Sequence, residues 1–301
     1  MFGFSKKTRQ AGRTSSAVIE SLEGRQFLSA TITGATIHDI TGNGASAGDK
    51  RQAGITVELY QDVNKNGVID SADGAAFATT VSNKSGAFKF TKVPFGSYLM
   101  KESLPENMVQ TTPMLTNVYT IEAAKKKTYA GHKFYNYVKN FDATQVTNVS
   151  YVINGTNRVT DLRLNVKEGD TVRVEFTLLS TQTVTLASYR TTNPNGIPLS
   201  DQKLYDKAGG VALKAGTYAL EVQIPKSYFQ VDFVGGVALD KFGLTASNVN
   251  YTNQDRLLGA DMGGTKVLAT GRGVVTFVKT MNKKWHGVYE LVEEAFVQKK
   301  K

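Results

Sequence analysis

Apolar and polar residues alternate with a period of two along several short stretches of this chain. In residues 55–60, Ile55, Val57 and Leu59 alternate with polar or amphipathic neighbours. The same pattern recurs in residues 171–176 (TVRVEF) and 218–224 (YALEVQI). Because successive side chains of a strand point to opposite faces, this pattern predicts strands that bury one face.

Turn-forming residues separate these stretches. Examples are residues 83–86 (NKSG), 167–170 (KEGD) and 193–196 (NPNG), all rich in the residue types that favour turns. A chain of 301 residues has room for about two domains. We therefore predict an all-β protein of two β-sandwich domains, residues 31–140 and 141–301. Apolar residues at helical spacing in residues 288–296 predict a short C-terminal helix.

A calcium-binding loop is predicted at residues 62–73. Oxygen donors occupy its first, third, fifth, seventh, ninth and twelfth positions: the side chains of Asp62, Asn64, Asn66, Asp70 and Asp73, and the carbonyl of Val68. Ca²⁺ takes six to eight oxygen ligands, and a glycine at position six, here Gly67, permits the sharp turn. The alternative is a metal-free turn, because Asp, Asn and Gly also favour turns. The flanking strands argue against the paired helices of an EF-hand.

Residues 39–44 (DITGNG) repeat the beginning of this loop. Ala47 and Lys50 stand where the later ligands would be. We therefore expect a decayed calcium site, so that loss of Asp39 should change the stabilisation by calcium little.

A family resemblance extends the loop assignment. Residues 86–105 (GAFKFTKVPFGSYLMKESLP), together with the loop, are similar to the pattern of SdrD B-like and Cna-B domains. Members of those families are transthyretin-like β-sandwiches that serve as stalks or spacers of surface proteins. The resemblance implies that fold and role for residues 31–140.

The N-terminal segment, residues 1–30, differs from the rest of the chain. Its residues 22–30 (LEGRQFLSA) resemble the LEPR-XLL segment near the start of many planctomycete surface and exported proteins. The resemblance implies export, and we expect this segment to be disordered. Charged residues interrupt its apolar stretch, so it is not a membrane span.

The cysteine and histidine counts and the net charge exclude several kinds of functional site. The sequence has no cysteine and only three isolated histidines, and a formal net charge of +10 is spread along the chain. Disulfides and cysteine-based zinc sites are excluded, and no nucleic-acid footprint is predicted. No motif of a known catalytic site is present, so we expect no enzyme.

The leading hypothesis is an extracellular or cell-surface structural protein, a calcium-stabilised spacer or adhesion module. The alternative hypothesis is a carbohydrate-binding or adhesive module. Part of a carbohydrate-active enzyme is a third hypothesis, which the sequence favours less. The candidate sugar-stacking residues are Tyr189, Tyr205, Tyr228 and Trp285. The expected partners are cell-surface glycans or other surface proteins.

The resemblance also generates a prediction about a covalent cross-link. Some Cna-B relatives join a lysine to an asparagine through an isopeptide bond, with a buried glutamate as proton shuttle. The resemblance places Glu102 at the position of the glutamate and Asn136 at that of the asparagine. The lysine should lie in the first strand, but residues 31–38 contain no lysine to attack the amide. We expect no such bond. Intact-mass measurement checks this, because bond formation expels ammonia, and a mass short by one ammonia would contradict the prediction.

Overall fold

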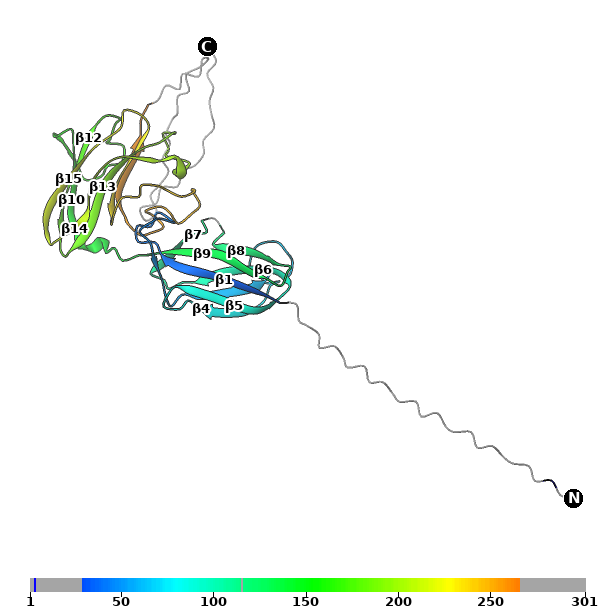
Figure 1. Cartoon of the computed structure of the whole chain (residues 1–301). Coiled ribbons are helices and arrows are strands. Elements are labelled where there is room, and N and C mark those ends of the chain that lie inside the picture. Colours follow the sequence, from blue (N-terminus) through cyan, green and yellow to red (C-terminus); the bar gives the residue numbers. More distant parts are fainter. Residues whose placement is uncertain (1–2, 4–28, 115, 266–301) are drawn as a thin grey trace, which may run out of the picture.

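The computed structural model describes residue 3, residues 29–114 and residues 116–265. The expected C-terminal helix, Trp285 and most of the N-terminal segment lie outside the described residues. The described part of the chain consists of strands and two short 3₁₀ helices, Ala143–Gln145 and Leu199–Asp201. Its strands form four sheets in two sandwiches (Figure 1). The prediction of an all-β protein with two β-sandwich domains is confirmed.

The first sandwich packs two sheets against each other. One has the order β2-β1-β9-β7 with β5 also paired to β1, and the other has the order β4-β3-β6-β8. Among the strands that the structure describes, β1 and β9 are the only pair that runs parallel. The strands are β1 (Ser29–His38), β2 (Lys50–Arg51), β3 (Thr56–Gln61), β4 (Ala78–Val81), β5 (Ala87–Pro94), β6 (Gly96–Ser103), β7 (Met108–Thr112), β8 (Val118–Ala123) and β9 (Thr128–Val138).

The first strand begins two residues before the expected domain boundary. Ser29 pairs with Pro94 and Ala30 with Val93, and Ala30 is part of the core. Residues 29–30 therefore belong to the sandwich and not to the preceding segment.

The second sandwich has two four-stranded sheets, β11-β10-β12-β15 and β14-β13-β16-β17. The predicted strands at residues 171–176 and 218–224 correspond to β12 and β15. The strands are β10 (Val146–Ile153), β11 (Asn157–Val159), β12 (Thr171–Leu178), β13 (Gln182–Arg190), β14 (Lys203–Leu213), β15 (Gly216–Gln223), β16 (Phe229–Gly235) and β17 (Leu257–Gly263).

One sheet of the second sandwich is buried on both faces. Phe229, Val231 and Phe233 of β16 point into the core between the two sheets. Val234 packs on the opposite face in a second cluster, which includes residues from the segment 236–256 such as Phe242. As a result every residue of β16 is buried. The segment 236–256 therefore acts as a third layer over this sheet.

The Asp39 turn, residues 39–44, is a structural element of the first domain. The Asp39 carboxylate is fully buried and accepts hydrogen bonds from the backbone N–H groups of Gly42 and Gly44, both at 2.8 Å. It also accepts one from the Thr111 hydroxyl at 2.7 Å. An Asp side chain that bonds the following backbone N–H groups fixes a turn. Loss of Asp39 would therefore leave the buried N–H groups of Gly42 and Gly44 without their acceptor, whereas the Thr111 hydroxyl could still donate to the Tyr135 carbonyl oxygen.

The turn presents its carbonyl groups to the second domain. Arg256 Nη1 donates to the carbonyl oxygen of Thr41 at 2.8 Å, and Gln254 Nε2 donates to that of Gly42 at 2.6 Å. The Asn43 side chain donates to Asp240 at 2.8 Å. These bonds join residues about two hundred positions apart in the sequence and connect the two sandwiches.

Arg256 is the central residue of this interface. It is 1% exposed, and its guanidinium also donates to the carbonyl oxygen of Val237. The Cζ atom lies 5.2 Å from the ring centre of Tyr137 in the first domain and 5.0 Å from that of Tyr251 in the second. Carbonyl dipoles and aromatic faces thus surround this buried cation.

We expect Arg256→Ala to destabilise the protein by about 2–4 kcal/mol, because it leaves buried carbonyl groups without their donor. The two sandwiches should then unfold in separate transitions, as measured by calorimetry. The control is Lys139→Gln, which removes the more exposed Lys139–Asp255 ion pair at 2.8 Å and should cost less than about 1 kcal/mol. Equal melting of both variants and the parent would contradict this role of Arg256.

Candidate calcium loop and buried acids

The predicted calcium loop connects β3 to β4, and the Asp62 carboxylate lies at its start. Asp62 is buried, with 4% exposure. Its two oxygens accept the backbone N–H groups of Asn66 and Gly67, both at 3.1 Å. Gly67 has φ +75°, a left-handed conformation in which glycine carries no steric cost. Asp62 therefore draws the loop backbone around its own carboxylate.

Asp73 closes the loop from the other end. It is 7% exposed, and its oxygens accept the backbone N–H groups of Val63 and Asp70, both at 3.0 Å. The two buried carboxylates thus bind the loop backbone from opposite ends. Because Asp73 accepts the N–H of Val63, residues that are ten positions apart in the sequence meet and close the loop.

Asp70 gathers the two amide side chains of the loop. One carboxylate oxygen accepts Asn64 Nδ2 at 3.0 Å and Asn66 Nδ2 at 2.7 Å, and the other accepts the backbone N–H of Ala72 at 2.8 Å. These bonds favour the ionised form and lower the pKa of Asp70, the bond from Ala72 having the largest effect. The structure therefore brings three predicted ligands together at the loop surface.

The donor types of the loop fit a hard cation. Carboxylate and amide oxygens are what Ca²⁺ prefers. Asp62 and Asp73 accept one N–H per oxygen, so these oxygens still have lone pairs for an ion. The Val68 N–H donates to Asn66 Oδ1 at 2.8 Å. The carbonyl oxygen of Val68 is the remaining predicted ligand. Within the described residues, no group of three or more His, Cys, Asp or Glu side chains is placed to hold a metal ion. A calcium site here would thus depend on the amide and backbone oxygens as well, and it stays a prediction.

The three candidate sugar-stacking tyrosines differ in their exposure to solvent. Tyr189 and Tyr228 are buried, with 0% and 2% exposure, and the Tyr189 hydroxyl donates to the Leu239 carbonyl oxygen at 2.9 Å. Their rings cannot serve as surface platforms, so this part of the expectation is wrong. Tyr205 is 42% exposed and remains available. Trp285 lies outside the described residues.

Glu102 is a buried acid in the core of the first domain. Its Oε1 accepts Asn136 Nδ2 at 3.1 Å, so the structure places this pair together as the family resemblance implied. Glu102 Oε2 and Asn136 Oδ1 have no hydrogen-bond partner in the described part of the chain. Burial raises the pKa of Glu102 to about 8, against the smaller opposing effect of the Asn136 hydrogen bond. The acid is therefore neutral at pH 7.

Asp232 is a second buried acid, which the sequence analysis did not single out. It lies in β16 with 0% exposure, and its two oxygens accept Gln230 Nε2 at 2.9 and 2.8 Å. Burial raises its pKa to about 7, while the hydrogen bond from Gln230 opposes this. The alternation of apolar and polar residues in 229–233 would place Asp232 on the outward face of the strand, so the sequence carries no signal for this burial.

Comparisons with known proteins give remote similarities only. No family profile matches the sequence, and no curated protein matches it. Among solved structures, the minor pilin GBS52 of Streptococcus agalactiae is 19% identical with a TM-score of 0.27, over 37% of this chain and 45% of that one. The major pilin BcpA of Bacillus cereus is 10% identical with a TM-score of 0.27, over 70% and 65%. The major pilin SpaD of Corynebacterium diphtheriae is 10% identical with a TM-score of 0.25, over 69% and 61%.

These similarities assign neither a family nor an activity, and the chain spans less than half of the first of these proteins. The fold class rests on the sheets described above. Among the described residues there is no helix with the length and apolar character needed to cross a membrane.

We expect the two buried acids to make stability fall as pH rises. Glu102 has a pKa of about 8 when folded, above its ordinary value of 4.5. Its contribution is therefore complete below pH 4.5 and is lost, at up to about 1.4 kcal/mol per pH unit, as pH rises to 8. Asp232 acts with the same sign between its ordinary value of 3.8 and about 7.

Denaturant unfolding from pH 5 to 9 checks this expectation. Glu102→Gln should flatten the dependence between pH 7 and 8, because a neutral amide replaces the neutral acid. Asp232→Asn, as the matched control in the other domain, should flatten only the range below pH 7. A parent protein whose stability does not change from pH 5 to 9 would contradict both assignments.

Proposed function

We propose that this chain is a calcium-stabilised structural module, a non-catalytic spacer or adhesion unit of an extracellular or cell-surface protein. The observation that carries the proposal is the loop of residues 62–73. Two of its carboxylates, Asp62 and Asp73, are buried at opposite ends of one turn, and a third lies beside two amide side chains. An oxygen-rich loop of this kind suits Ca²⁺, which is plentiful outside cells.

The geometry of the two domains supports a spacer. A spacer transmits position only if its domains keep a fixed relation, and buried hydrogen bonds from Arg256 and Gln254 to the Asp39 turn connect the two sandwiches. The chain has no cysteine, so a bound ion would supply the cross-link that disulfides supply elsewhere.

The placement of the perturbed acids favours a non-catalytic role. Catalytic groups with shifted pKa values normally sit in clefts, where they reach a substrate. Glu102 and Asp232 are instead buried within the sandwiches and hydrogen-bonded to amide side chains. Their shifts therefore support a structural origin. Other surface proteins and surface glycans are the partners that such a module would meet.

The ion would act by holding the loop together. Three carboxylates near one turn repel one another without a cation, and a ligand that binds only the folded state stabilises it by about 2.7 kcal/mol at one hundred times its Kd. The residues that would hold Ca²⁺ are Asp62, Asn64, Asn66, Asp70 and Asp73, with the Val68 carbonyl.

We expect Ca²⁺ to raise the melting temperature relative to the same protein in excess chelator. Asp70→Asn should remove most of this increase while leaving stability in chelator nearly unchanged, because the three hydrogen bonds of Asp70 all lie within the loop. The matched control is Glu106→Gln, which removes an exposed acid from the same domain and should retain the full response.

Hydrogen exchange locates the effect. Ca²⁺ should slow exchange in residues 62–73 and the adjoining β3 and β4, and should change β12 and β13 little. Superimposable melting curves with calcium and with chelator would refute the proposal, as would an undiminished response in Asp70→Asn.

A further inference from the structure

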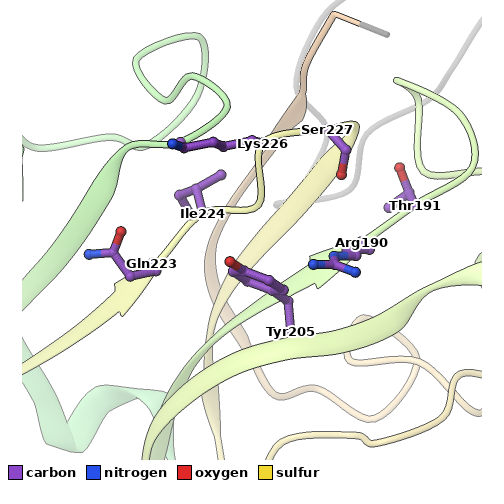
Figure 2. A pocket seen from close by; sticks show the side chains of 8 residues that line it. Arg190, Thr191, Tyr205, Gln223, Ile224, Lys226 and Ser227 are labelled. Atoms are coloured by element: carbon purple, nitrogen blue, oxygen red, sulfur yellow. The ribbon is translucent and has the colours of Figure 1, made fainter.

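A polar cavity lies in the second domain, far in sequence from the calcium loop. Its volume is about 470 Å³, within the range of small-molecule sites. The side chains around it come from β13, β14, β15 and the turn after β15 (Figure 2). Those with polar or charged ends are Arg190, Thr191, Tyr205, Gln223, Lys226 and Ser227.

Two cations line this cavity without a protein counter-ion. Neither Arg190 nor Lys226 forms a salt bridge to any residue in the described part of the chain. The nearest acid along β14, Asp206, accepts the backbone N–H groups of Gln223 and Lys207 at 2.8 and 2.9 Å, and it is not among the lining residues. The cavity therefore offers positive charge to a ligand.

The Arg190 side chain is held in place by an aromatic ring. Its Cζ atom lies 4.7 Å from the centre of the Tyr205 ring, and Figure 2 shows the two side chains next to each other at one side of the opening. A guanidinium that stacks on a ring keeps its N–H groups free in its own plane, where they match the two oxygens of a carboxylate. Tyr205 thus orients a carboxylate-binding group.

The remaining lining groups suit a ligand rich in hydroxyl groups. Gln223 Nε2 donates to the Thr171 hydroxyl at 2.6 Å, which fixes its amide and leaves the amide oxygen as an acceptor. Thr191 and Ser227 add hydroxyl groups. The Tyr205 side chain, which is 42% exposed, adds apolar surface, as the carbon face of a sugar requires.

We propose that this cavity binds an acidic saccharide through its carboxylate. Arg190 receives the carboxylate, Lys226 adds a second positive charge, and the hydroxyl and amide groups contact the sugar ring. This binding role goes beyond the structural role proposed above and does not depend on the calcium loop, because every lining residue belongs to the second domain.

Calorimetric titration with an oligogalacturonate at about 0.15 M salt tests the proposal. Arg190→Gln should weaken binding by about tenfold or more, the usual effect of losing a charge-assisted pair. Tyr205→Ala should weaken it as well, whereas Tyr205→Phe should retain it because the ring is kept. Both positions, Arg190 and Tyr205, are exposed, so the melting temperatures of the three variants should stay near that of the parent.

Two controls separate a site from general attraction to a basic protein. Lys84→Gln removes an exposed charge in the first domain and should leave binding unchanged. A neutral oligosaccharide of equal length should bind at least tenfold more weakly, and inorganic sulfate at equal ionic strength should not compete as well as free galacturonate.

The outcomes decide the proposal either way. No binding by the parent overturns it, and so does undiminished binding by Arg190→Gln or an equal loss in Lys84→Gln. Titration in excess chelator should give the same affinity as in calcium. Failure of the calcium response therefore leaves the saccharide result standing, and the reverse also holds.

Discussion

The turn around Asp39 is the constraint on which the arrangement of the whole molecule depends. A buried carboxylate accepts three hydrogen bonds and so fixes the backbone carbonyl groups of Thr41 and Gly42. Those carbonyl groups then receive Arg256 and Gln254 of the second domain. A guanidinium buried without a paired carboxylate costs several kcal/mol unless dipoles surround it. The turn of the first domain therefore solvates the buried cation of the second, and neither is complete alone.

The same local chemistry recurs in the candidate calcium loop. In both segments the first aspartate accepts backbone N–H groups a few residues further on: Asp39 from Gly42 and Gly44, and Asp62 from Asn66 and Gly67. The shared beginning of the two sequences thus reflects turn formation in both places. What differs is the continuation: after the first segment a single carboxylate, that of Asp49, returns to the turn and accepts the Ile40 N–H at 3.3 Å, whereas the second loop has both Asp70 and Asp73. That difference makes residues 62–73 the candidate ion site and leaves residues 39–44 as an interface.

The sequence was informative where one face of a strand is buried, and less so elsewhere. Strands β12 and β15 follow their alternation, because one face meets the core and the other meets solvent. Strand β16 has the same alternation, yet Asp232 is buried because the segment 236–256 covers the outer face. That segment has no periodic pattern, so nothing local predicts its position. For the same reason Arg256 could not be singled out, since arginine is rarely buried and its partners are remote in the chain. The predicted start of the first domain, residue 31, lies two residues after the observed start of β1. The small residues Ser29 and Ala30 suit both an export segment and a strand, so the sequence did not distinguish the two.

The chain has no cysteine, and the two sandwiches are stabilised without disulfides by different features. The first leaves a long loop between β3 and β4 at its edge and organises it around charged carboxylates, which a cation can bridge. The second uses residues 236–256 as an additional apolar layer, with Phe242 packed against Tyr189 and Tyr251. This layer ends in Gln254 and Arg256, the residues that bind the Asp39 turn. Packing of the second domain and attachment to the first are therefore properties of one segment. A change that loosens the layer would also release the interface, whereas a change in the candidate calcium loop acts at a separate edge of the first domain.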